Sequence, residues 1–133
     1  MNLTRTAILL VAVTSSYFAI GQRFSSDFAP CAAGPANTVA PLHSDSLSSS
    51  FLICVPREVR PHYHDWHTEH VVVIEGEGEM LLGDSVFVIR SGDAIAIPKG
   101  TVHAVTTLSE RPLRVVSIQS PRFDGADRVP VER

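Results

Sequence analysis

The sequence predicts an all-β domain, either a sandwich or a closed barrel. From residue 51 onward, short runs rich in β-branched residues alternate with turn signals built from glycine, proline, serine and aspartate. No window has the periodicity of a long amphipathic helix. Closely spaced short strands of this kind are typical of sandwiches and barrels. The expected strands are residues 50–55, 60–64, 69–74, 79–82, 85–90, 94–97, 102–107 and 113–119.

Four of the boundaries between these strands carry turn signals built from glycine. Gly83 and Asp84 predict a tight hairpin between strands 79–82 and 85–90, because two-residue hairpin loops favour glycine. Elsewhere, proline and glycine occur at positions whose backbone N–H is not needed for hydrogen bonding between strands. The remaining turn signals lie at residues 76–78, 91–93 and 98–100.

The run Val71-Val72-Val73-Ile74 is apolar on both faces of its strand. One face is expected to line the barrel interior, while the other meets a second layer or a partner chain. A homodimer is therefore the expected assembly.

Composition sets the class of protein. The chain has 133 residues, of which 44% are hydrophobic and 19% charged, with a formal net charge of −3. This length corresponds to one domain and suffices for a continuous core. Because no run of basic residues is present, we expect no nucleic-acid partner.

The N-terminal segment differs from the rest. Residues 1–21 contain no acidic residue, one base and an interrupted apolar run, as in a cleaved secretory signal peptide. A retained membrane anchor and a cytosolic amphipathic arm are the alternatives; cleavage would leave no stable membrane insertion. A Ser/Pro-rich flexible arm is expected at 22–49, the barrel at 50–120 and a tail at 121–133. The expected location is periplasmic or secreted.

Four of the six histidines fall within residues 62–70. His62 and His64 are two residues apart, so their imidazoles share one face of a strand. If the chain turns back at 65–68, Glu69 opens the returning strand and meets both imidazoles across a hairpin. His103, just past the 98–100 turn, can face the same cavity. Imidazole and carboxylate donors together suit a divalent transition metal.

These residues carry a resemblance to the cupin family. The family's first motif, H-x-H-x4-E-x6-G, is matched by His62, His64, Glu69 and Gly76. Its second motif is matched by Gly92, Pro98, Gly100 and His103, although the closing Asn is replaced by Thr107. The resemblance implies a double-stranded β-helix, or jelly-roll, barrel. It also implies a metal, whether Zn, Mn, Ni, Cu or Fe, held by His62, His64, Glu69 and His103.

The remaining histidines and the cysteines leave alternatives open. His67 lies in the expected turn and His70 faces away from Glu69, so neither is expected to be a ligand. A helix would instead align His64, His67 and His70, but the valine run that follows argues against one. Cys31 and Cys54 either form a disulfide or leave Cys54 as a buried thiol.

The predicted function is an exported metal-binding cupin that acts on a small molecule, by an oxygenase- or isomerase-type reaction at a three-histidine, one-glutamate centre. Glu69 is the candidate catalytic residue, as a general base. The alternatives are a non-catalytic module that binds or senses a metal or small ligand, and a barrel that serves mainly in dimer formation. Loading outside the cytosol favours Zn, Cu, Ni or Mn over Fe(II).

Overall fold

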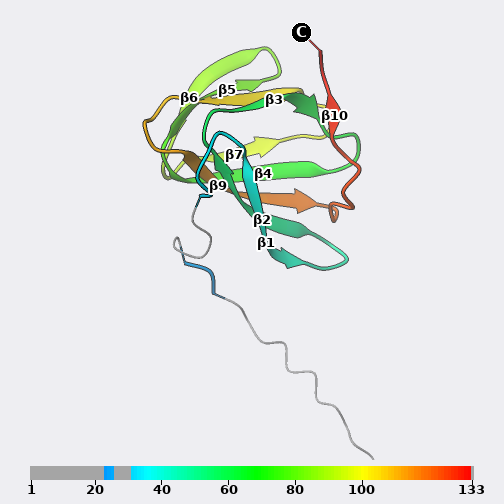
Figure 1. The fold of residues 1–133 in the computed structure, drawn as a ribbon. Helices are drawn as coiled ribbons and strands as arrows, with labels where there is room; N and C mark the ends of the chain where they lie inside the picture. The colour runs from blue at the N-terminus through cyan, green and yellow to red at the C-terminus, as the bar shows by residue number, and fades with distance from the viewer. Residues whose placement is uncertain (1–22, 26–30, 133) are drawn as a thin grey trace, which may run out of the picture.

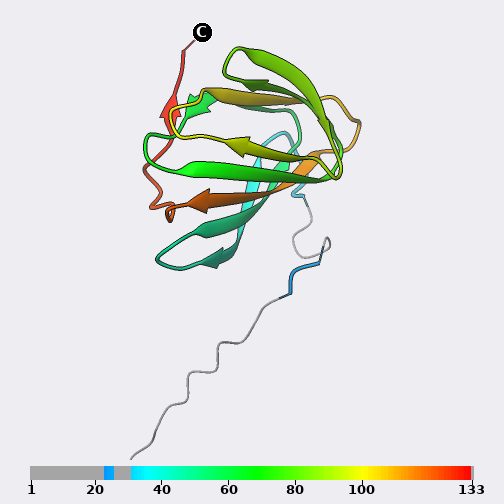
Figure 2. The same ribbon diagram turned by 180° about the vertical axis from the view of Figure 1, so that it is seen from behind.

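A computed structural model describes residues 23–25 and 31–132, and it confirms the all-β jelly-roll prediction. Two five-stranded antiparallel sheets face each other (Figures 1 and 2). The expected signal peptide, residues 1–21, lies outside the described residues. The first sheet has the order β1 (Thr38–Ser44), β2 (Ser49–Val55), β9 (Leu113–Ser120), β4 (Thr68–Glu75), β7 (Ala94–Ile97). The second has the order β10 (Val129–Pro130), β3 (Glu58–Tyr63), β8 (His103–Thr107), β5 (Glu77–Leu82), β6 (Ser85–Arg90).

All eight expected strands are present, as β2 to β9, with ends shifted by at most two residues. The Gly83-Asp84 hairpin is confirmed, because Leu82 pairs directly with Ser85 and Gly83 has a φ of +58°. Gly76, the glycine of the first motif, has a φ of +86°. A Cβ at Gly76 would lie 3.0 Å from the backbone of Pro112 and Leu113, so no other residue fits there without strain.

One expectation about topology is wrong. We expected residues 60–64 and 69–74 to form a hairpin, but β3 and β4 belong to opposite sheets. β4 pairs with β7 and β9, whereas β3 pairs with β8 and β10. The turn at 65–67 is therefore a crossover between the sheets. Glu69 meets the histidines across the barrel interior and not along a ladder.

The segments expected to be an arm and a tail each contribute an edge strand. β1, within the expected flexible arm, pairs with β2, and its register shifts between Pro41 and His43. β10, within the tail, pairs with β3 and contains Pro130. Proline is tolerated on edge strands because one side of the strand makes no ladder bonds. An edge strand is also less constrained in its side chains than a central strand. These two strands therefore lack a clear apolar alternation, and they were not predicted.

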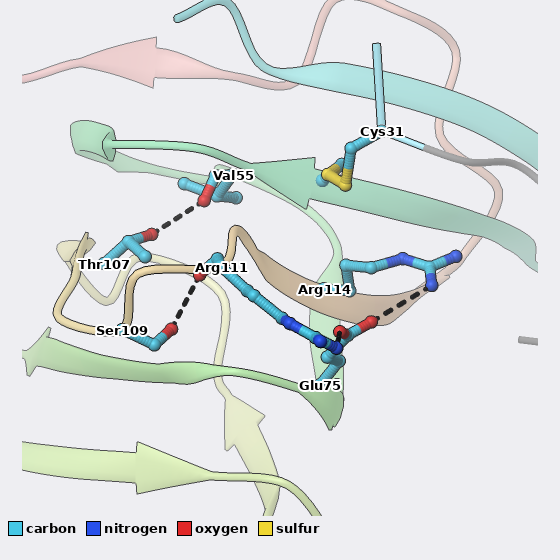
Figure 3. Close-up of a disulfide and its surroundings, with 8 residues drawn as sticks. Cys31, Val55, Glu75, Thr107, Ser109, Arg111 and Arg114 are labelled. Carbon is cyan, nitrogen blue, oxygen red and sulfur yellow. Dashed lines mark hydrogen bonds and ion pairs between the residues drawn. A yellow bond between two sulfur atoms is a disulfide. The ribbon is translucent and has the colours of Figure 1, made fainter. Parts of the chain in front are cut away.

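A disulfide joins Cys31 to Cys54, with the two Cα atoms 5.7 Å apart (Figure 3). Of the two alternatives left open by the sequence, the structure shows the disulfide and not the buried thiol. It fastens the chain before β1 to strand β2. Nearby, the half-buried Glu75 carboxylate pairs with Arg111 and Arg114 at 3.3 and 3.2 Å.

The barrel interior changes from apolar to polar along single strands. In β9 the inward residues are Leu113, Val115, Ser117 and then Gln119, and all four are buried. The antiparallel register sets Glu69 of β4 opposite Gln119. Among the described residues, no helix is long and apolar enough to cross a membrane. The apolar end is formed by Val55, Val71, Val73, Met80, Ile89, Ile95, Ile97, Leu113 and Val115.

Candidate metal centre

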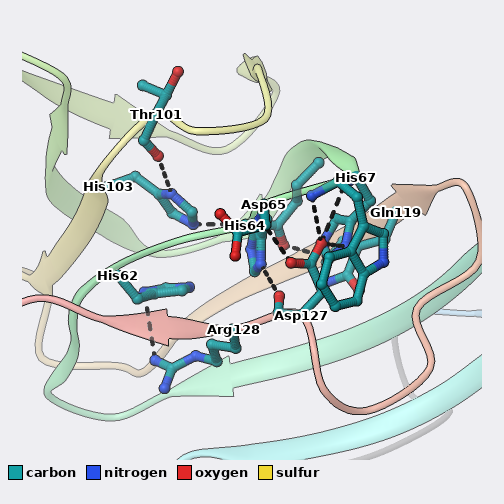
Figure 4. A network of polar contacts seen from close by, with 12 residues as sticks. His62, His64, Asp65, His67, Thr101, His103, Gln119, Asp127 and Arg128 are labelled. Atoms are coloured by element: carbon teal, nitrogen blue, oxygen red, sulfur yellow. Dashed lines mark hydrogen bonds and ion pairs between the residues drawn. The ribbon is translucent and has the colours of Figure 1, made fainter.

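The four predicted metal ligands lie together at the polar end of the barrel. Figure 4 shows the three histidines, His62, His64 and His103, side by side. His62 lies on β3, His64 just after it, Glu69 on β4 and His103 at the start of β8. All four are buried, with exposed fractions of 3–6%. Glu69 Oε2 lies 3.3 Å from Nε2 of both His64 and His103. The three imidazoles bring ligand nitrogens within 4.8 Å of one another.

Each of these imidazoles uses its Nδ1 to hold its orientation. His62 Nδ1 donates to the Arg60 carbonyl at 2.8 Å and His103 Nδ1 to the Thr101 carbonyl at 3.0 Å. His64 Nδ1 donates to the Asp127 carbonyl. These bonds turn each Nδ1 away from the site and leave the Nε2 atoms facing it, as in protein metal sites. The buried Nε2 of His103 has no hydrogen-bond partner among the described residues. The donor set therefore fits a divalent transition metal.

The pKa values follow from burial and from the contacts between these groups. Burial lowers the pKa of His62 to about 3, with the charge of His103 as a further cause. Burial alone would raise the pKa of Glu69, but the His103 and His64 imidazoles close to its carboxylate and the hydrogen bond from Ser117 hold this pKa well below its usual range. Burial likewise opposes protonation of His64, but hydrogen bonds to Glu69 and Asp127 outweigh it and raise the pKa. In the metal-free site, Glu69 is thus an anion.

Two polar residues of β9 support Glu69. Ser117 Oγ donates to Glu69 Oε1 at 2.5 Å, which leaves Oε2 facing the imidazoles. Gln119 Nε2 donates in turn to Ser117 Oγ at 3.4 Å. Neither residue was predicted from the sequence. The signal that identifies them is their inward position in the strand alternation, combined with the register that places Gln119 beside Glu69.

Asp127, in the expected tail, holds the crossover turn. Its buried carboxylate accepts hydrogen bonds from the backbone N–H groups of Asp65, Trp66 and His67, at 2.6, 3.1 and 3.1 Å. Its carbonyl accepts the bond from His64 Nδ1. Burial tends to raise the pKa of Asp127, but these backbone donors lower it. No local pattern marks Asp127, since its partners lie about sixty residues earlier.

His67 is more closely connected to the site than the sequence indicated. It is fully buried and stacks on His64 with ring centroids 4.0 Å apart. Its Nδ1 lies 2.6 Å from Asp127 Oδ2. His64, His67 and Asp127 are a second group able to hold a metal. That His67 is not a ligand stays a prediction, whereas His70 is exposed, as its alternation with Glu69 predicts.

A cavity of about 390 Å³ opens onto these ligands. Its walls are mainly apolar, with Ile53, Val59 and Met80 among the lining residues. Glu69 is the only acidic residue among those that line it. Arg128 lines both this cavity and a shallow depression outside it. The arrangement provides a buried group of residues that could hold a metal ion, an apolar chamber and the cationic side chain of Arg128 beside it.

Comparison with known sequences identifies one family. Residues 51–119 match the family described as the cupin domain. An uncharacterized protein of Aquifex aeolicus is 38% identical over 84 residues, which cover 63% of this chain and 69% of that protein. Mannose-1-phosphate guanylyltransferase RfbM of Salmonella typhimurium is 28% identical over 66 residues. That match spans half of this chain but only 14% of the guanylyltransferase.

Solved structures show the same fold. A double-stranded β-helix protein of Klebsiella pneumoniae superposes with a TM-score of 0.73 at 22% identity, covering 85% of this chain and 99% of that one. KdgF of Halomonas sp. gives 0.68 at 23% identity, covering 79% and 97%. Streptomyces Pac13, in a variant with uridine, gives 0.67 at 14% identity, covering 85% and 92%. At these identities the likeness concerns the fold.

Proposed function

The chain belongs to the cupin domain family, and from that premise we propose that it is a metal-dependent cupin that acts on a small molecule. The observation that carries the proposal is the convergence of three oriented imidazoles and the Glu69 carboxylate on a cavity of about 390 Å³. Small-molecule chemistry is compatible with this fold, since Pac13 is a nucleoside dehydratase and has been solved with uridine. We propose Zn, Mn, Ni, Cu or Fe as the metal.

In this proposal His62, His64, His103 and Glu69 hold the metal, which when bound supplies a Lewis acid and a template for the substrate. Ser117 fixes Glu69 Oε1, so the second oxygen points at the imidazoles. The apolar walls exclude water from the bound molecule. Glu69 is the only carboxylate on the cavity wall and is the candidate general base for an isomerase- or oxygenase-type reaction. A Glu69→Gln variant that kept both the metal and full activity would exclude this role.

The alternative is a non-catalytic module that binds or senses a metal or a small ligand. It is favoured by the lack of a second acidic residue among the residues that line the cavity. One experiment separates the two. A small-molecule extract is incubated with metal-loaded protein and followed by NMR. Consumption of a compound indicates turnover, whereas broadening without consumption indicates binding alone. His103→Gln should abolish either effect, and His70→Gln, on the exposed face of β4, should leave it intact.

We also propose export to the periplasm or outside the cell. The composition of residues 1–21 and the Cys31–Cys54 disulfide support this, because disulfides persist in oxidising compartments. Loading there favours Zn, Cu, Ni or Mn over Fe(II). Cell fractionation and N-terminal sequencing should recover a periplasmic or secreted chain that begins at Gln22. Recovery of an uncleaved cytosolic chain would contradict export, and stoichiometric iron in the exported protein would contradict the metal preference.

A homodimer is the proposed assembly. It is supported by the edge strand β6, where Val86, Phe87 and Val88 are 59%, 37% and 38% exposed. An exposed apolar edge strand favours pairing with another chain. Sedimentation velocity should give a dimer that Val86→Lys weakens, and a monomer across the micromolar range would contradict the proposal.

A further inference from the structure

We propose that the cavity binds a small molecule bearing a carboxylate, and that Arg128 pairs with this carboxylate while the rest of the molecule faces the metal site. The inference rests on the proposed metal centre and names the substrate class that the centre would take. The observations that carry it are the position of Arg128, the lack of an acidic partner for it, and the charge balance of the cavity.

The backbone fixes Arg128 beside the site. It directly precedes β10, where Val129 pairs with Tyr63 and Pro130 with His62. One further hydrogen bond runs from the Val131 N–H to the Pro61 carbonyl, at 3.0 Å. Figure 4 shows the guanidinium pointing at the His62 ring, with Nη2 3.4 Å from Nδ1. Arg128 is thus held at the cavity mouth by main-chain pairing.

No described residue neutralises this cation. His62 Nδ1 donates its proton to the Arg60 carbonyl at 2.8 Å, so it has no lone pair to offer Arg128. Among the ion pairs of the described residues, none includes Arg128. The outer side of the guanidinium faces solvent, and on the cavity side its hydrogen-bond donors are free to pair with a bound anion.

The charges of the cavity favour an anion. A divalent metal held by three neutral imidazoles and one carboxylate keeps one net positive charge, and Arg128 adds a second. Glu69 is the only acidic residue that lines the cavity, and the metal would engage it. The outer depression adds Arg57 and Arg60 to Arg128, against the single acid Glu58. A cationic mouth leading to apolar walls attracts and retains small anions.

A carboxylate is the anion that suits both the cationic mouth and the apolar walls of the cavity. Its planar pair of oxygens matches the guanidinium fork, which binds it through two parallel hydrogen bonds. A carboxylate also loses less hydration than a phosphate dianion on entering an apolar chamber. The inferred ligand is therefore a compact organic acid with a second oxygen donor that can reach the metal.

The test compares two ligands that differ by one charge. Succinate and succinamate have nearly the same shape. A divalent metal binds a carboxylate in preference to an amide, so in both ligands a carboxylate faces the metal, and the group left for Arg128 is a carboxylate in succinate and an amide in succinamate. Their affinities for zinc-loaded protein are measured by isothermal titration calorimetry. We expect succinate to bind about tenfold more tightly than succinamate. This ratio is near the lower limit for a charge-assisted hydrogen bond, because the outer side of Arg128 faces solvent. This preference should shrink as the ionic strength rises.

Variants test whether Arg128 causes the preference for succinate over succinamate. Arg128→Gln should reduce it to less than about threefold, whereas Arg128→Lys should retain an intermediate value because the charge stays and the fork is lost. Arg122→Gln removes an exposed arginine of the same segment and should leave the preference unchanged. An equal preference in wild type and Arg128→Gln would overturn the inference, as would tighter binding of inorganic phosphate than of succinate.

The design also separates this inference from the proposed function. If the wild-type protein takes up no zinc, the proposed metal centre fails. Succinate is then titrated into metal-free wild-type protein and into metal-free Arg128→Gln. Tighter binding to the wild type would still support the carboxylate subsite, and equal binding would overturn it.

Discussion

The two ends of the barrel interior are built in different ways, although the same strands pass through both. At the apolar end, Leu113, Val115 and Val73 pack through the simple alternation of β9 and β4. At the polar end, the imidazoles are held by hydrogen bonds, one of which comes from Asp127, about sixty residues away in sequence. The comparison predicts that separate sets of residues control folding stability and the orientation of the imidazoles.

The largest expected effect belongs to the apolar end. Leu113 is 1% exposed, so Leu113→Ala should lower the free energy of unfolding by about 2–5 kcal/mol, through lost burial and a new cavity. Metal affinity of the folded variant should stay unchanged. Urea denaturation and a metal-competition titration measure the two quantities. Leu108→Ala, at a 52% exposed position, is the control and should cost little. A parallel loss of metal affinity in folded Leu113→Ala would mean that the two ends are not separate.

A smaller effect, on the opposite property, is expected at the polar end. Asp127→Asn removes one carboxylate oxygen from the turn and the charge beside His67. We expect metal affinity to fall about 10–100-fold, the usual range when a residue that orients a ligand is changed. Asp124→Asn is the matched control, since among the described residues that exposed side chain bonds the nearby Ala126 N–H alone. An affinity within twofold of wild type would show that the Asp127 carboxylate does not contribute to the orientation of His64.

The smallest effect is a dependence on pH. The pKa of His64 lies above its ordinary value of 6.5, so the metal-free site binds a proton that the metal must displace. Metal affinity should therefore rise with pH, by at most about tenfold per unit, and level off above the pKa of His64. His62, with a pKa of about 3, is already neutral and adds nothing to this slope. Calorimetry in two buffers measures how many protons are released when the metal binds. A release of two or more protons per metal above pH 6.5 would contradict the prediction.

Sequence reasoning reached those parts of the molecule that depend on short-range pattern. The eight central strands follow from alternation and turn residues, and the clustering of His62, His64, Glu69 and His103 follows from motif spacing. The hairpin expected between His64 and Glu69 was wrong because a turn of this length serves equally well as a crossover between sheets. Ser117, Asp127 and Arg128 were not predicted, since their roles depend on register and on a tail that returns to the site.

The edge strands were missed for a related physical reason. β1 and β10 carry prolines and mixed polarity, which an edge position tolerates and a central strand does not. Their local sequences therefore resemble loops. The sequence could not decide whether Cys31 and Cys54 form a disulfide, because that depends on the distance and orientation of the two cysteines in the fold.

Anomalous diffraction from crystals of the metal-loaded protein tests the central claim most directly. The account predicts one peak per chain, about 2.0–2.2 Å from Nε2 of His62, His64 and His103 and from a Glu69 oxygen, as metal–ligand bonds require. The second cluster offers a clear alternative position, between His64, His67 and Asp127. A peak there, or no peak in protein saturated with metal, would contradict the account.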